Sequence, residues 1–307
     1  MIKTEHLSKR YEALTAVDDV SFEVRPGEVL GFLGPNGAGK TTTMRMLAGF
    51  ITPTSGRASI CGHDIETDTL AAKASLGYLP EGAPSYGEMT VQAFLEFIAD
   101  LRQLKGEQRA KRLAYVIGRL QLEQVLAQTI DTLSKGFRRR VGLAQALIHD
   151  PPVLILDEPT DGLDPNQKHE VRTLINEMAR DKIIVISTHI LEEVEAVCSR
   201  AIIIARGRIV ADDTPASLAT QSRYHNAVSL RLERSEQLAS ARTAIAALPG
   251  VAEVEVSERD ARLTALPRAG ASILTALNEL ATRQGLKLKE LHLESGRLDE
   301  VFRTKTA

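Results

Sequence analysis

The sequence predicts an α/β fold, with a parallel sheet flanked by helices, over its first two thirds. Three short apolar runs indicate the sheet, at residues 29–33, 153–156 and 183–186. Each run is continuous rather than alternating, which is typical of central strands that are covered on both faces. Helical patterns follow Gly39 and Pro165, between these runs. Strand and helix patterns in this order favour a parallel sheet with helices on its faces.

A helical insertion is expected within this domain, over about residues 88–145. Strand patterns stop between residues 90 and 133, and apolar residues recur at helical spacing from Val91 to Leu101 and again from Leu113 to Leu120. The step Lys105-Gly106 separates the two helices. We expect the apolar stripe of these helices to be core rather than interface.

A second domain is expected over residues 225–307, with the first domain ending at residue 222. Alternating apolar residues predict strands near 228–232, 254–256, 261–265 and 286–293. Helical spacing predicts helices at 238–248 and 273–280, and a short terminal helix that carries Phe302. The order β-α-β-β-α-β is that of a ferredoxin-like α+β unit.

Composition excludes several classes of function. The 307 residues carry a formal net charge of −2, so no global field favours binding to nucleic acid. Cys61 and Cys198 have no CxxC spacing, and we expect packing roles for them rather than a disulfide or a metal site. The N-terminus lacks the apolar core of a signal peptide, and no segment approaches the roughly 18 apolar residues that span a bilayer. If the protein serves a membrane process, another chain is expected to supply the spans.

A phosphate-binding loop directly follows the first apolar run. Residues 34–41, GPNGAGKT, fit the pattern GxxxxGK[ST] at every fixed position. Glycines let backbone N–H groups surround an anion, and the helix N-terminus adds its partial positive charge. The residues expected to bind the nucleotide here are Gly34, Pro35, Asn36, Gly37, Ala38, Gly39, Lys40, Thr41 and Thr42. Lys40 would reach the β- and γ-phosphates, and the Thr41 hydroxyl would ligate Mg²⁺.

Two adjacent acids follow the second apolar run. Asp157 and Glu158 are followed by Pro159, which ends the strand. In α/β folds, ligands bind at the carboxyl ends of parallel strands. Successive side chains point in opposite directions, so we expect different roles: Asp157 holds Mg²⁺, and Glu158 accepts a proton from the attacking water. His189 follows the third run at the same edge, where an imidazole could contact the γ-phosphate.

The remaining motifs and their order resemble those of a known protein family. Leu133-Ser134-Lys135-Gly136-Phe137 resembles the LSGGQ signature of ABC ATPases, and stands some twenty residues before the paired acids. Asp164 resembles the D-loop aspartate, and His189 the switch histidine. Tyr11 lies where the family stacks an aromatic ring on adenine, with Val17 close behind. The resemblance covers residues 1 to about 220.

The resemblance implies an ABC cassette that binds ATP and Mg²⁺, hydrolyses ATP and dimerises head to tail. Ser134 and the Gly136 amide of one chain would then complete the γ-phosphate site of a second copy, so a homodimer is sufficient. The helical insertion is where the family docks coupling helices of an integral membrane permease. The chain would therefore lie on the cytoplasmic face of the membrane, held peripherally by that permease, and no direct contact with nucleic acid is expected.

Two positions depart from the family pattern. Glu81 stands at the position that resembles the Q-loop glutamine, and it would add negative charge beside Mg²⁺ and the γ-phosphate. We hypothesise that Glu81 coordinates the metal or its water once ATP is bound. The signature has Lys135 for glycine and Phe137 for glutamine, but it keeps the phosphate-facing groups. The basic run 138–140 is expected to be a solvated or dimer-facing helix surface.

The Pro-Glu Q-loop, the LSKG signature and the C-terminal extension resemble ATPase subunits of ABC-2-type exporters, in the branch of gliding-motility and copper-enzyme-maturation transporters. Two alternatives stay open. One is a soluble ABC ATPase that acts on ribosomes or DNA; the other is an importer ATPase whose C-terminal domain senses a ligand. Residues 225–307 carry no cluster of acids, cysteines or histidines that would define a ligand site, which favours a structural or dimerising role for that domain.

Overall fold

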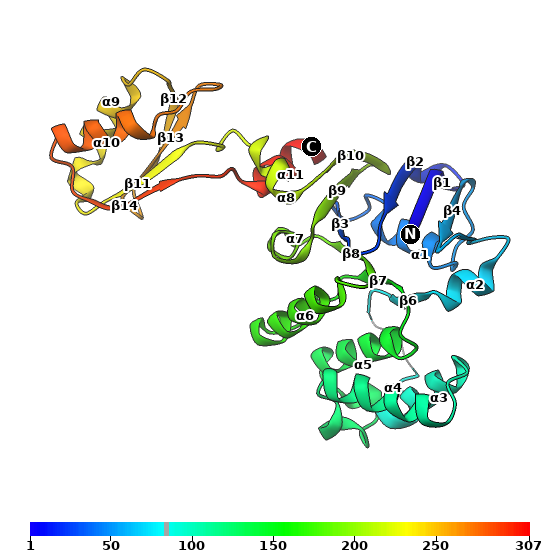
Figure 1. Cartoon of the computed structure of the whole chain (residues 1–307). Coiled ribbons are helices and arrows are strands. Elements are labelled where there is room, and N and C mark those ends of the chain that lie inside the picture. The colour runs from blue at the N-terminus through cyan, green and yellow to red at the C-terminus, as the bar shows by residue number, and fades with distance from the viewer. Residues whose placement is uncertain (83–85) are drawn as a thin grey trace. The chain divides into compact units, whose positions relative to one another are not determined.

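The computed structural model describes residues 1–82 and 86–307. The chain forms two compact units, Met1–Thr214 and Pro215–Lys305 (Figure 1). The division falls earlier than the expected boundary at residue 222, because the segment after Thr214 associates with the C-terminal end of the chain. The Arg223 amide donates to the Glu300 carboxylate at 3.2 Å, and Gly296 closely approaches the Ala219 carbonyl.

The central sheet of the first unit has six strands in the order β10-β9-β3-β8-β7-β6. Its strands are β3 (Val29–Leu33), β6 (Leu76–Leu79), β7 (Val153–Asp157), β8 (Ile183–Thr188), β9 (Arg200–Ala205) and β10 (Arg208–Asp213). The five strands from β9 to β6 are parallel, and only β10 is antiparallel. The three expected strands are confirmed, and they lie side by side as β3-β8-β7. Their carboxyl ends therefore share one edge.

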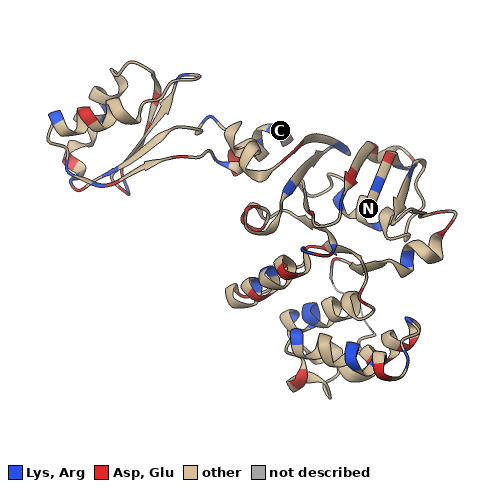
Figure 2. Ribbon diagram, in the orientation of Figure 1, with Lys and Arg blue, Asp and Glu red and all other residues tan. Residues whose placement is uncertain are grey.

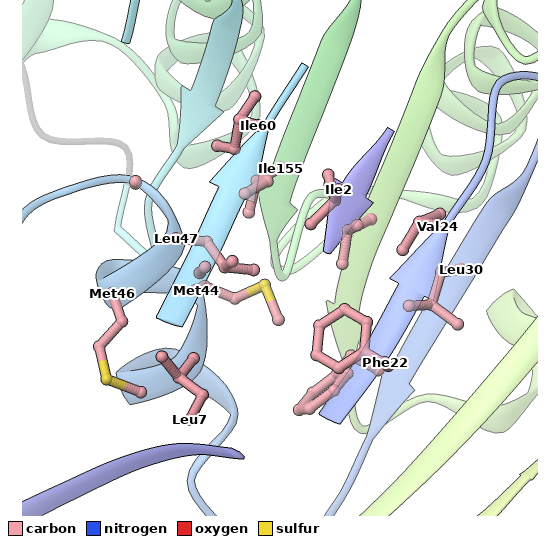
Figure 3. Packing of buried hydrophobic residues seen from close by; sticks show 14 of the residues in the cluster. Ile2, Leu7, Phe22, Val24, Leu30, Met44, Met46, Leu47, Ile60 and Ile155 are labelled. Carbon is pink, nitrogen blue, oxygen red and sulfur yellow. The ribbon is translucent and has the colours of Figure 1, made fainter. Parts of the chain in front are cut away.

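A second, antiparallel sheet was not expected. Its strands are ordered β2-β1-β4-β5 and comprise β1 (Ile2–Tyr11), β2 (Leu14–Val24), β4 (Ser55–Ile60) and β5 (His63–Asp64). The hydrophobic core joins residues of both sheets and of helix α1 (Lys40–Leu47), as Figure 3 shows for Phe22, Leu30, Met44 and Ile155. Helix α1 is thus anchored through its apolar side, which fixes the loop that precedes it.

Six further helices lie in the described residues of this unit, some in the helical insertion and the others beside the sheet. The insertion contains α3 (Val91–Leu101), α4 (Gly106–Arg119) and α5 (Lys135–Leu147), with 3₁₀ turns at Glu123–Val125 and Ile130–Thr132. Figure 2 shows basic residues on both α4 and α5. The remaining helices of this unit are α2 (Thr69–Ala74), α6 (Pro165–Met178) and α7 (Leu191–Val197). The stripe on α3 is core at Phe94 and Leu95, as expected, but Leu101 is 66% exposed.

The second unit contains a four-stranded antiparallel sheet in the order β12-β13-β11-β14. Its elements are α8 (Pro215–Thr220), β11 (Val228–Leu232), a 3₁₀ turn (Ser235–Gln237), α9 (Leu238–Ala246), β12 (Val251–Ser257), β13 (Arg262–Pro267), α10 (Leu274–Arg283), β14 (Leu288–Leu293) and α11 (Leu298–Thr306). Apolar residues of the sheet and of α9 and α10 form one core. The expected strands and helices are all present. Over residues 1–82 and 86–307, no helix has the length and apolarity needed to cross a membrane.

Candidate active site

The phosphate loop connects β3 to α1, and two of its positions require glycine because a side chain there would clash with neighbouring backbone. Gly39 caps α1 with φ of 109°, and a Cβ there would lie 2.5 Å from the Ala16 carbonyl oxygen. A Cβ on Gly34 would lie 2.5 Å from the Ile204 carbonyl oxygen. Larger residues therefore cannot enter without moving β2 or β9. The loop therefore packs closely against both strands and leads into a helix N-terminus, and a glycine-rich loop in that position forms the backbone cradle that binds phosphate.

Lys40 lies within this cradle. Its side chain is buried, and Nζ donates to the carbonyls of Gly34 at 2.7 Å and Pro35 at 3.2 Å. Burial lowers the pKa of Lys40, while the negative charges of Glu158 and Asp157 oppose this shift. The ammonium group is therefore already placed at the loop, beside the two acids.

Asp157 ends β7, and its environment fits a magnesium ion. Ser187 donates to Oδ1 at 2.5 Å, whereas Oδ2 is buried and has no hydrogen-bond partner among the described residues. Burial raises the pKa of Asp157, and the hydrogen bond from Ser187 opposes this shift. The negative charge of Glu81 also raises this pKa, whereas Thr41 and Lys40 lower it. A divalent cation at the free oxygen would relieve the cost of burying this carboxylate.

Thr41 and Glu81 both influence the Asp157 carboxyl, but the three proposed metal ligands are not a complete metal cage. In the described part of the chain, no three His, Cys, Asp or Glu side chains come together in a group that could hold a metal ion. Mg²⁺ commonly uses one or two carboxylates together with substrate phosphates and water. Thr41 and Asp157, with Glu81 close by, suit that mode of binding.

Glu158 and His189 form a direct pair. His189 Nδ1 lies 3.0 Å from both Glu158 carboxylate oxygens, an arrangement in which Nδ1 donates and Nε2 is left for another partner. Glu158 has φ of 52°, and its amide donates to the Ser187 carbonyl at 2.9 Å. A left-handed non-glycine residue costs about 1–3 kcal/mol, and active sites are one of the places where such residues cluster. The Glu158 side chain is 12% exposed, so it retains access to the loop.

The basic run 138–140 differs from the expected solvated surface. Arg139 and Arg140 are 4% and 7% exposed, and only Arg138 is exposed. Arg140 pairs with Glu170 at 2.8 Å, and its guanidinium lies 5.6 Å from the ring centre of Phe137. The charge pattern could not reveal this, because both arginines bond partners that are distant in sequence.

The signature residues surround the N-terminus of α5. Ser134 is the N-cap, and its hydroxyl accepts a hydrogen bond from the Phe137 amide at 3.3 Å. Gly136 is buried against Gln167 of α6: a Cβ there would lie 2.6 Å from Gln167 Oε1. Asp164 caps α6 by accepting from the Gln167 amide at 2.9 Å. Ser134 and Asp164 are both exposed, so these caps lie at the surface of the unit.

The two residues expected near adenine have different positions. Tyr11 ends β1 and is 42% exposed, with Lys9 Nζ 5.2 Å from its ring centre. Val17 is completely buried, and its Cγ2 lies 3.3 Å from where a Cβ on Gly39 would be. The structure thus places Val17 beneath the phosphate loop as a support, rather than as an open face for adenine.

One buried residue near the site carried no signal in the sequence analysis. Glu193 of α7 is 2% exposed and accepts hydrogen bonds from Thr160 and Thr188, the latter at 3.0 Å. It thereby connects the segment after Glu158 with the residue before His189. Glu193 lies one turn beyond His189, in the first turn of α7, and this spacing is what could have marked it as a residue near the site.

The phosphate loop, the buried acids at the strand ends and the parallel sheet define a P-loop nucleotide-binding fold. The family profile described as "ABC transporter" matches residues 17–161. A solved "ATP binding subunit of ABC transporter" is 32% identical with a TM-score of 0.68, covering 72% of this chain and 92% of that one.

Three curated relatives extend this likeness. The linearmycin resistance ATP-binding protein LnrL of Bacillus subtilis is 32% identical over 303 residues, which cover 98% of this chain and 97% of LnrL. The Nod factor export ATP-binding protein I of Paraburkholderia xenovorans is 38% identical, covering 71% of this chain and 72% of that protein. The probable multidrug ABC transporter ATP-binding protein YbhF of Escherichia coli is 36% identical over 72% of this chain, which spans only 38% of the length of YbhF. This chain belongs to the ABC transporter family, as an ATP-binding subunit.

Proposed function

We propose that the chain binds Mg-ATP on residues 34–42 and hydrolyses it, as the ATPase subunit of an exporter. The observation that carries this proposal is the pairing of Glu158 with His189 beside the unpartnered oxygen of Asp157. Glu158 would accept the proton of the attacking water, and His189 would hold that carboxylate and present Nε2 toward the γ-phosphate. Lys40 would exchange the carbonyls of Gly34 and Pro35 for phosphate oxygens. Mg²⁺, when bound, neutralises charge on the phosphates.

Glu158→Gln tests the assignment of the base. The amide has the same shape but cannot accept the proton, so the variant should bind ATP and lose turnover by about 10²-fold or more. Glu192→Gln, a change on the neighbouring helix α7, serves as the control and should keep the parent rate. Hydrolysis by Glu158→Gln at the parent rate would show that the base lies elsewhere.

Glu81 is proposed to bind Mg²⁺ or its water when ATP is present. Its charge influences the pKa values of both Asp157 and Lys40, which supports a place beside the metal. Glu81→Gln should raise the Mg²⁺ concentration needed for half-maximal turnover. If both the Mg²⁺ dependence and the turnover stay unchanged, this role is wrong.

A second copy of the chain is proposed to complete the site. Ser134 is exposed at the start of α5, where the first N–H groups of a helix have no partner within the helix. Such groups bind anions, so Ser134 and the Gly136 amide could contact the γ-phosphate held by the partner, with Asp164 at the same interface. Glu158→Gln with ATP should accumulate as a dimer in light scattering, and addition of Ser134→Arg should keep it monomeric.

The permease partner is proposed to dock beside the helical insertion and to be of the ABC-2 type. Tyr86 and Phe97 are 60% and 40% exposed, and their ring centres lie 5.5 Å apart. The named relatives include a resistance protein and an export protein, which supports an exporter. In detergent extracts, the parent should co-purify with a multi-spanning protein at the cytoplasmic face, and Phe97→Ser should weaken this. Val210→Ser, an exposed apolar change on β10 and outside the insertion, is the control. Recovery with ribosomes would overturn the proposal.

The second unit is proposed to be a ferredoxin-like accessory domain with a structural or dimerising role. Its strand order and its two core helices support this fold. The likeness to LnrL extends over 98% of this chain, so it includes this unit.

A further inference from the structure

Arg139 connects the ends of two neighbouring strands through their backbone. Nη1 donates to the Pro80 carbonyl at 3.1 Å, and Nη2 donates to the Asp157 carbonyl at 3.1 Å and to the Glu158 carbonyl. Pro80 directly follows β6, and Asp157 ends β7, which pairs with β6. One side chain from α5 therefore bonds the segment that leads to Glu81 and the segment that carries Glu158.

The environment of this guanidinium indicates a specific geometric role. Arg139 is 4% exposed, and its Nε is buried with no partner among the described residues. Its bonds are to carbonyls, so its charge is not neutralised by one carboxylate. An apolar residue would avoid the cost of burying a charge. The planar fork of arginine, however, can bond carbonyls from two chain segments at fixed directions, which a lysine ammonium does less well.

A second contact lies on the same face of α5. Lys135, one turn before Arg139, pairs with Asp161 at 2.8 Å, and its side chain occupies the space beside Gly162 that a Cβ would need. The pair is exposed and contributes little to stability. It does fix the loop after Glu158 to the start of α5, so this helix holds that loop at two points.

We propose that Arg139 is a positioning residue for hydrolysis, which sets the placement of Glu158 relative to Glu81. The inference rests on the proposed role of Glu158 as the base. Because one guanidinium bonds both segments, a displacement of the Pro80-Glu81 segment is passed to the Glu158 backbone. Nucleotide binding depends on the phosphate loop, which Arg139 does not contact. Loss of Arg139 therefore lowers kcat and leaves the KM for ATP nearly unchanged.

The test measures steady-state ATP hydrolysis by the full chain. Arg139→Gln should lower kcat by about tenfold or more, with KM within about twofold, and Arg139→Lys should recover part of the loss. Arg140→Gln is the matched control: it removes an equally buried arginine from the same helix, whose partners are Leu120, Gln121 and Glu170. It should reduce stability and leave kcat within about twofold.

A double-mutant cycle separates positioning from a general structural role. The factor by which Glu81→Gln changes kcat should differ by at least about threefold between the parent and an Arg139→Lys background. Equal factors in both backgrounds, or parent-like kcat in both Arg139 variants, overturn the inference. If Arg139→Gln does not fold, Arg139→Lys alone completes the cycle. A parent that does not hydrolyse Mg-ATP, or an active Glu158→Gln, would instead overturn the proposed function.

Discussion

Gly39→Ala should destabilise the phosphate loop through backbone strain and through a steric clash, and the two contributions can be separated. Gly39 has φ of 109°, and a new Cβ would lie 2.5 Å from the Ala16 carbonyl oxygen, well inside contact distance. A left-handed backbone costs an L-residue roughly 1–2 kcal/mol. Forcing a methyl group into a packed site costs roughly 1–3 kcal/mol more. The expected loss is therefore roughly 2–5 kcal/mol.

Gly37→Ala is the matched control in the same loop. Gly37 has φ of 78°, but no atom lies within 4 Å of a Cβ placed there, so only the strain of roughly 1–2 kcal/mol applies. Denaturation of both variants can be followed by circular dichroism, because the chain contains no tryptophan. Gly39→Ala should also bind ATP more weakly, since the clash displaces amides of the cradle. Equal losses in the two variants would refute the steric argument.

The remaining predictions concern adenine, pH and a buried acid. Tyr11→Ala should weaken ATP binding by about tenfold, from lost stacking, and Tyr11→Phe should not; equal Kd values would remove Tyr11 from the site. Burial lowers the pKa of His149 from 6.5 to about 4, so the unfolded chain binds more protons between these pH values. Stability is then full above about pH 6.5 and falls by up to about 3 kcal/mol towards pH 4, as unfolding at several pH values can measure, and His149→Gln should lack this dependence. Glu193→Ala leaves two threonine hydroxyls without their acceptor, which should cost about 1–3 kcal/mol and lower kcat, whereas a parent-like melting curve would contradict this.

The central sheet could be predicted because its strands are short apolar runs, and such runs are diagnostic when helical patterns separate them. The phosphate loop and the paired acids could also be predicted, because each is a motif of residues that are adjacent in the sequence. The antiparallel sheet was not expected. Its strand β1 alternates buried and exposed residues only in part, with register shifts after Thr4 and Leu7 that disturb the period of two.

Burial was the least predictable property of the site residues. Val17 was assigned to the nucleotide site through the family resemblance, but it packs against Gly39 and is completely buried. Arg139 looked like one member of a basic run, and a charge run is normally solvated. Its carbonyl partners follow β6 and β7, which are remote in sequence, so only the pairing of those strands brings them to α5.

The position of Arg139 also bears on why an acid is tolerated at residue 81. The negative charge of Glu81 adds to burial in raising the pKa of Asp157, and Glu158 is the next acid along the chain. Lys40 and Arg139 are the buried cations that interact electrostatically with all three. Because Arg139 bonds carbonyls rather than one carboxylate, its charge acts on the group as a whole. In an Arg139→Gln background, Glu81→Gln should therefore lower kcat less than it does in the parent. The substitution then removes a repulsion that no arginine offsets.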